Sequence, residues 1–119
     1  MDYKLTDAEL TLMNIIWDGG EVKAIEVARQ AGEEKGWKKN TVYTMLSRLI
    51  DKGIVERREP GFVCVPLIDR ETVSRAESVS VVDKFFEGSL SLFARAFVRE
   101  KKLTEADIEE LKRIIEENK

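Results

Sequence analysis

The sequence predicts a mainly α-helical protein with one small β-hairpin, organised as an N-terminal domain at 1–68 and a C-terminal helical region at 69–119. Three observations predict this fold class. Apolar side chains recur with helical spacing along most of the chain, and two runs of β-forming residues, at 54–58 and 62–66, flank a Pro-Gly turn. Charged residues make up 36% of the 119 residues and apolar residues 43%, a balance typical of helices with one solvated face.

The first helix is expected to run from Asp7 to about Trp17. Thr6 and Glu9 have the spacing of a capping box, in which the Thr6 hydroxyl accepts from the Glu9 N–H and the Glu9 carboxylate accepts from the Thr6 N–H. The Asp-Gly-Gly sequence at 18–20 favours a stop directly afterwards. The apolar residues that share the buried face are Ala8, Leu12, Ile15, Ile16 and Trp17.

Two further helices are expected at about 22–34 and 39–52. Gly36 separates them, and Gly53 ends the second. Lys38 stands at the N-cap position of the 39–52 helix, where lysine is a poor capping residue. Each helix has an apolar stripe for the core. The stripes consist of Val22, Ile25, Val27, Ala28 and Ala31 in one helix and of Val42, Met45, Leu46 and Leu49 in the other.

The runs at 54–58 and 62–66 are joined by a segment containing Pro60 and Gly61, so they predict a β-hairpin. Three helices followed by a hairpin is the order of elements in a winged helix-turn-helix domain. In helix-turn-helix proteins, the recognition helix lies in the major groove of DNA and directs its N-terminal side chains at the bases.

Three more helices are expected at 69–87, 89–99 and 104–117, with Ser89 and Thr104 as caps. So few helices offer little interior for so many large apolar side chains, and burying one Phe or Leu contributes roughly 1.5–3 kcal/mol. We therefore expect a second copy of the chain to cover them; the alternative is that they fold back on the N-terminal domain. The expected dimerisation residues are Val82, Phe85, Phe86, Leu90, Phe93, Phe97, Ile108, Leu111 and Ile115.

Positive charge is concentrated in one part of an acidic protein. The net charge of the chain is −3, yet the segment 35–58 has seven basic and two acidic residues. This segment contains the 39–52 helix and the first strand of the hairpin, and such a concentration of basic residues is typical of a surface that faces phosphate. The alternative interpretation is an ordinary solvated face.

The outward side chains of the 39–52 helix are the expected readers of base edges. Asn can hydrogen-bond adenine, and Thr can bond a base or contact the methyl group of thymine, whereas the basic residues should mostly hold phosphates. Tyr43 is expected to contact a phosphate or a sugar, and Glu59 predicts that the hairpin contacts DNA weakly. The expected DNA-binding residues are Lys38, Lys39, Asn40, Thr41, Tyr43, Thr44, Arg48, Lys52, Arg57 and Arg58.

Over nearly its whole length the sequence resembles the penicillinase repressor family, which includes the BlaI, MecI and CopY repressors. The residues that carry the resemblance are Leu5-Thr6-Asp7-Ala8-Glu9 with Ile16-Trp17, Gly36-Trp37, Asn40-Thr41-Val42-Tyr43-Thr44-Met45-Leu46 with Arg48-Leu49, Lys52-Gly53, and Leu103-Thr104 with Asp107-Ile108-Glu109-Glu110-Leu111. The resemblance implies a homodimeric repressor of transcription that binds inverted repeats, often of the TACA…TGTA type.

At the contact positions of the family, Thr41, Thr44 and Arg48 match the common residues. Asn40 and Tyr43 stand where relatives often carry basic residues, so the resemblance implies a different operator preference.

Release of DNA in the antibiotic-resistance branch of the family involves proteolysis, commonly at an Asn-Phe pair. The matching pair is Ala96-Phe97, which keeps the aromatic residue but not the asparagine. The resemblance thus adds a membrane-bound sensor protease as a candidate partner. Copper sensing is not expected, because the paired cysteines of copper-responsive members are missing from 114–119.

Other function classes have little support in the sequence. There are no histidines, and Cys64, the single cysteine, has no base beside it for nucleophilic catalysis. We therefore expect no enzyme, no metal site and no cofactor. One cysteine, no signal peptide and no long apolar run favour a cytoplasmic protein. The remaining rival is a winged helix that binds proteins, and the salt dependence of duplex binding would discriminate it.

Overall fold

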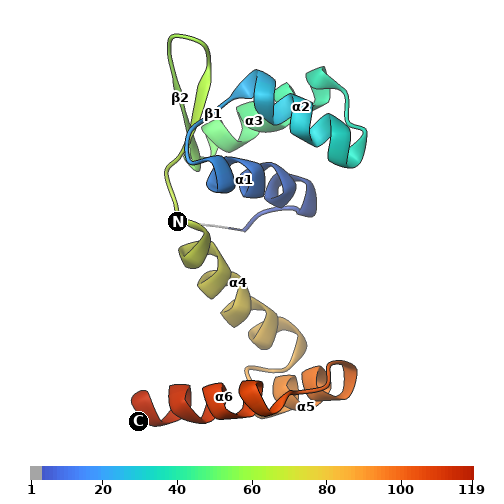
Figure 1. Ribbon diagram of the computed structural model, residues 1–119, viewed down its shortest axis with the longest axis vertical. Coiled ribbons are helices and arrows are strands. Elements are labelled where there is room, and N and C mark those ends of the chain that lie inside the picture. The colour runs from blue at the N-terminus through green and yellow to red at the C-terminus, as the bar shows by residue number, and fades with distance from the viewer. Residues whose placement is uncertain (1–3) are drawn as a thin grey trace. The chain divides into compact units, whose positions relative to one another are not determined.

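A computed structural model describes residues 4–119 and confirms a mainly helical fold with a small sheet (Figure 1). Contacts divide the chain into two compact units, Met1–Ser78 and Val79–Lys119, and the division falls inside α4. The elements are α1 Asp7–Gly19, β1 Val22–Lys23, α2 Ala24–Lys35, α3 Lys39–Asp51, β2 Val55–Arg58, β3 Val63–Pro66, α4 Arg70–Phe85, α5 Leu90–Glu100 and α6 Glu105–Glu117.

The predicted caps are confirmed. At the start of α1, the Glu9 N–H donates to Thr6 Oγ1 at 3.1 Å, and the Thr6 N–H donates to Glu9 Oε1 at 3.0 Å. Thr104 and Asp107 form the same reciprocal pair at the start of α6. Ser89 accepts from the Leu92 N–H at the start of α5. Local side-chain chemistry thus fixes where these three helices begin.

The sheet has three antiparallel strands in the order β1-β3-β2, one more strand than the hairpin expected from the sequence. The expectation that a helix begins at Val22 is wrong: Val22 pairs with Cys64 and Lys23 pairs with Val63, so α2 begins at Ala24. The hairpin strands are also shorter than expected by one residue each, since β2 begins at Val55 and β3 at Val63.

The start of α2 also changes which of its side chains are buried. Ala24, Val27, Ala28 and Ala31 are buried at the spacing i, i+3, i+4 and i+7. Ile25, which we expected in the stripe, follows Ala24 by one residue and is 52% exposed. Because successive helical residues lie about 100° apart, the four buried side chains share an arc of about 100°, and Ile25 lies about 60° beyond its edge.

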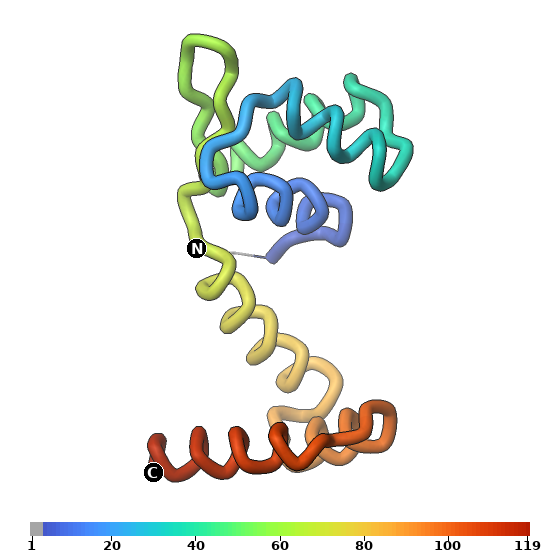
Figure 2. The backbone as a smooth tube through the Cα atoms, viewed as in Figure 1, coloured from blue at the N-terminus to red at the C-terminus, as the bar shows by residue number. Residues whose placement is uncertain are grey.

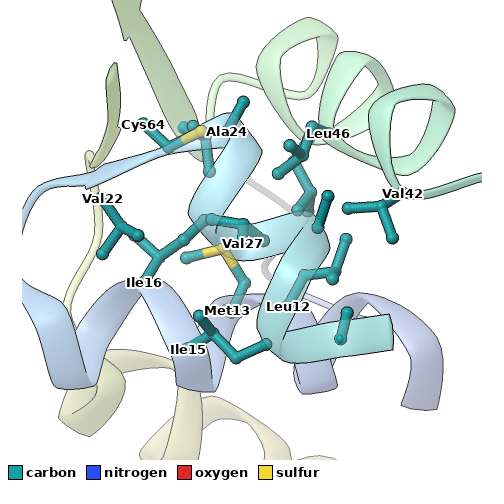
Figure 3. Close-up of a cluster of buried hydrophobic side chains, with 14 of the residues drawn as sticks. Leu12, Met13, Ile15, Ile16, Val22, Ala24, Val27, Val42, Leu46 and Cys64 are labelled. Atoms are coloured by element: carbon teal, nitrogen blue, oxygen red, sulfur yellow. The ribbon is translucent and has the colours of Figure 1, made fainter. Parts of the chain in front are cut away.

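The core of the N-terminal unit lies where α1, α2 and α3 meet the sheet (Figure 3). Leu12, Ile16, Val27 and Leu46 are fully buried in it. Cys64 reaches the same core from β3, and burial raises the pKa of its thiol to about 11. The thiol is therefore protonated at neutral pH and unreactive, which fits the expected packing role.

The C-terminal unit exposes most of its apolar surface. Neither α5 nor α6, drawn in orange and red in Figure 2, contains a buried residue. The unit does contain a short row of aromatic contacts, because the ring centroid of Phe93 lies 5.5 Å from that of Phe86 and 6.0 Å from that of Phe97. Within residues 4–119, no helix is long and apolar enough to span a membrane.

Candidate nucleic-acid interface

The third helix, α3, has one face in the core and one face in solvent. Val42, Leu46 and Leu49 are buried on the first. The exposed face carries the polar and basic side chains expected to touch DNA. Its members are Asn40, Thr41, Thr44, Ser47 and Arg48, with Lys38 and Lys39 exposed at the beginning of the helix.

Among the described residues, the basic side chains of α3 and its N-cap have no carboxylate partner. Within residues 4–119, Lys38, Lys39 and Arg48 form no ion pair with a carboxylate, and Lys39 Nζ instead lies 5.6 Å from the centroid of the Tyr43 ring. Lys38 makes no side-chain hydrogen bond as N-cap, which confirms the prediction of a poor cap. Its ammonium group, like those of its neighbours, therefore stays available to an anion outside the protein.

Tyr43 does not point freely into solvent. Its ring is half-buried and packs edge-on against Phe62, with centroids 5.6 Å apart and an angle of 82° between the ring planes. Aromatic pairs favour this T-shaped arrangement. Tyr43 thus joins α3 to the hairpin, a role that no pattern in the sequence predicted.

Lys52 has an internal partner. Its Nζ atom lies 2.8 Å from both carboxylate oxygens of Glu9, a side chain that is nearly buried. Burial raises the pKa of Glu9, but hydrogen bonds from Lys52 and the Thr6 N–H, with the charge of Lys52, lower it overall. The carboxylate is therefore ionised at neutral pH, and a phosphate at Lys52 would compete with it.

The arginines of the hairpin, the wing of this fold, are paired as well. The Arg57 guanidinium lies 3.8 Å from the centroid of the Phe62 ring, and its Nε donates to Glu59 at 2.5 Å. Arg58 Nε donates to Glu56 at 2.7 Å. The hydrogen bond that Arg58 donates to Glu56 and the negative charge of Glu56, with a smaller contribution from the charge of Glu21, raise the pKa of Arg58. Unpaired basic charge thus lies on α3, and paired basic charge lies on the wing.

The residues expected to join two chains all belong to the C-terminal unit and remain accessible. Phe85 is 74% exposed, Leu90 70% and Ile115 59%. Phe97, Ile108 and Leu111 are exposed too, while Val82, Phe86 and Phe93 are partly covered. Ala96, the other residue of the candidate cleavage pair, is exposed on α5. One chain by itself therefore leaves much of this apolar surface in water.

Sequence reasoning missed two contacts that organise this interface. Glu9 was identified as a capping residue, but its partner Lys52 is 43 residues away. Phe62 was assigned to a strand, whereas it lies in the turn with a φ of 50°. An aromatic residue next to a glycine was the available signal for the second contact, and no sequence pattern predicted the first.

Three helices, a small antiparallel sheet and a projecting hairpin, with polar and basic side chains on the outer face of the third helix, define a winged helix-turn-helix domain. The chain belongs to the family described as penicillinase repressor, whose model matches residues 5–117. It is 33% identical to the penicillinase repressor of Bacillus licheniformis over 118 residues, 98% of this chain and 92% of the relative. It is 27% identical to the methicillin resistance regulatory protein MecI of Staphylococcus aureus strain N315 over 115 residues, 95% of this chain and 94% of that protein.

Two solved structures match the N-terminal unit. The DNA-binding domain of the repressor BlaI is 36% identical with a TM-score of 0.53, and the match covers 56% of this chain and 84% of that chain. The Bacillus licheniformis BlaI monomer in complex with the blaP half-operator is 36% identical with a TM-score of 0.52, covering 57% and 85%. These matches, at more than a third identity, agree with the winged-helix fold of the N-terminal unit.

Proposed function

We propose that this protein is a homodimeric transcriptional repressor that binds an inverted-repeat operator with α3 in the major groove. The observation that carries the proposal is the exposed face of α3, where polar side chains suited to base edges lie beside basic side chains that form no ion pair with a carboxylate of residues 4–119. The family supports it, since relatives along the whole chain are repressors and a BlaI structure contains half-operator DNA.

The structure supports two kinds of DNA contact within the expected set. Asn40, Thr41 and Thr44 have the chemistry for base edges, and their exposure supports that role. Lys38, Lys39 and Arg48 supply affinity through phosphates.

The remaining four residues of the set have a different part in the proposal. Tyr43, Lys52, Arg57 and Arg58 already have partners inside the protein, so they position the helix and the wing and contact the DNA backbone less strongly.

Dimerisation through the region 69–119 is the second part of the proposal. Apolar patches of this kind on a single chain usually mark an interface, and covering each large side chain contributes roughly 1.5–3 kcal/mol. A two-fold dimer would present two copies of α3 to half-sites about 10 base pairs apart, or a multiple of that spacing.

Release from DNA is the third part. We propose cleavage of the Ala96–Phe97 bond by a membrane-bound sensor protease, in a cytoplasm where Cys64 stays reduced. The bond lies in α5, whose residues are accessible. Cleavage would require α5 to unfold locally, because proteases act on extended backbone exposed by local opening. Cleavage would divide α5 and separate α6 from the N-terminal domain, which would weaken the dimer and hence its affinity for two half-sites.

Duplex binding measured against salt concentration tests the proposal. Duplexes are first selected from a random pool with the purified protein, and affinity is then followed by fluorescence anisotropy between 50 and 200 mM salt. A DNA-binding protein loses affinity with a log–log slope of about −0.9 for each phosphate contact. A winged helix that binds only proteins would select no sequence and retain no duplex at the lowest salt concentration.

A further inference from the structure

Phe62, at the tip of the wing, is held by four separate contacts. Its carbonyl accepts from the Ala24 N–H at 2.9 Å, and its own N–H donates to Glu59 Oε2 at 3.2 Å. Tyr43 packs against one side of its ring, and the guanidinium of Arg57 lies 3.8 Å from the ring centroid. Its φ of 50° lies in the left-handed region that non-glycine residues rarely adopt, so these contacts determine the conformation of the turn.

Glu59 uses its two carboxylate oxygens for two different purposes. Oε1 accepts from Arg57 Nε at 2.5 Å, while Oε2 accepts from the Phe62 N–H. The hydrogen bond from Arg57, followed by that from the Phe62 backbone, lowers the pKa of Glu59. The carboxylate is thus charged at neutral pH, and its bond to the backbone keeps it at the tip even when Arg57 moves.

This arrangement places a negative charge beside Arg57, one of the two wing arginines expected to contact DNA. The side chains of Arg57 and Glu59 are 51% and 56% exposed, so a phosphate that approaches the first also approaches the second. Like charges brought together at an interface oppose binding. Among residues 4–119, the basic residues of α3 form no ion pair with a carboxylate, in contrast to Arg57.

Building on the proposed DNA-binding function, we propose that Glu59 is a positioning residue that acts through Arg57. It holds the guanidinium against Phe62 and away from phosphate, and so limits how much the wing adds to sequence-independent affinity. Binding then depends chiefly on the contacts of α3, which include the base edges. This favours specificity, because the binding free energy from phosphate contacts is the same on every duplex and holds the protein at non-specific sites.

Glu59→Gln in the full-length protein is the direct test. Glutamine keeps the length of the side chain and an oxygen for the Phe62 N–H, but it removes the charge. We expect tighter binding to a random-sequence duplex and a log–log salt slope steeper by about 0.9, the value for one added phosphate contact. Between 50 and 200 mM salt, the affinity of the variant should therefore fall about three- to fourfold more than that of the native protein.

Two further variants separate positioning from net charge. Glu109→Gln changes the net charge equally at an exposed position of α6, where the side chain is 69% exposed, and it should keep the native slope. Arg57→Gln as a single substitution should change the salt slope little. Combined with Glu59→Gln, it should return the steepened slope to the native value.

The outcomes are distinct. A native protein that binds no duplex at low salt overturns the proposed function and this inference together. If the native protein binds duplex in a salt-dependent way but Glu59→Gln leaves the salt slope unchanged, only the inference is overturned. The inference alone is also overturned if Glu109→Gln steepens the salt slope as much as Glu59→Gln does. The same holds if Arg57→Gln, as a single substitution, lowers the slope by the value for one phosphate contact.

Discussion

At the scale of single residues, the pair of Glu9 and Lys52 shows how one carboxylate can serve two structural purposes. Glu9 closes the capping box of α1 and also holds the end of α3 through Lys52. Its side chain is 6% exposed and that of Lys52 is 43% exposed, so solvent screens one end of the pair. An ion pair whose carboxylate is buried should contribute more to stability than a fully exposed pair.

Glu9→Gln should lower the free energy of unfolding by about 1–2 kcal/mol at pH 7, a range reduced from that for a buried charged partner because Lys52 is partly solvated. Folding lowers the pKa of Glu9, so its stabilising effect is present above the unfolded-state pKa and disappears as the pH falls through the folded-state pKa. Urea denaturation at neutral and acidic pH would show the difference between native protein and variant shrinking. Asp7→Asn, in the same first turn, is the control; a gap that stays constant down to acidic pH contradicts the assignment.

Substitutions of Arg48 and of Thr44 should affect DNA binding differently, the first through overall affinity and the second through sequence preference. Arg48→Ala should weaken binding to selected and random duplexes by similar factors, since a phosphate contact carries no base information. Thr44→Ala should cost about 1–3 kcal/mol on the selected site and change the preferred base. Both side chains are exposed, so stability should change by less than about 0.5 kcal/mol. Unaltered anisotropy curves for both variants would mean that another surface binds DNA.

At the scale of elements, the beginning of α4 belongs to the N-terminal unit. The indole Nε1 of Trp17 donates to the carbonyl of Ile68 at 2.9 Å, and Arg70 pairs with Asp18 at 2.7 Å. Val73 in α4 is only 4% exposed. The first turns of α4 therefore complete the packing around α1.

A fragment containing residues 1–78 should consequently fold more stably than one ending at 68. The shorter fragment loses burial of Val73, which contributes roughly 1.5–3 kcal/mol, together with the Arg70–Asp18 pair. Thermal unfolding followed by circular dichroism compares the two directly. Equal midpoints would mean that α4 adds nothing to the N-terminal unit and that the expected boundary at 68 is the better one.

Local sequence signals predicted most of the helices and strands. The main differences between expectation and structure come from pairing between residues far apart in the sequence. Glycines, capping residues and apolar spacing predicted every helix to within a few residues, because each signal acts within one or two turns. The strand at Val22 exists because Cys64 lies opposite it, and such pairing leaves little trace in two residues of sequence. The partner of Lys52 was likewise unpredictable, because Glu9 lies 43 residues away in the sequence.

At the scale of the whole molecule, we expect two chains to bind the operator together. Double substitution of Phe97→Glu and Leu111→Glu places charge on exposed apolar positions of α5 and α6 and should yield monomers. Because affinity for two half-sites depends on linkage, the monomer should bind a full operator far more weakly but a half-site almost normally. Sedimentation equilibrium at micromolar concentration measures the change. A native protein that sediments as a 13.6 kDa monomer would contradict the dimer.

The central claim is that the exposed face of α3 lies in the major groove. A crystal structure of the full-length protein on a duplex selected from a random pool tests it most directly. We expect Asn40, Thr41 and Thr44 to lie at base edges in each half-site, with Lys38, Lys39 and Arg48 near phosphates. A complex in which that face contacts protein or solvent, while another surface holds the DNA, would contradict it.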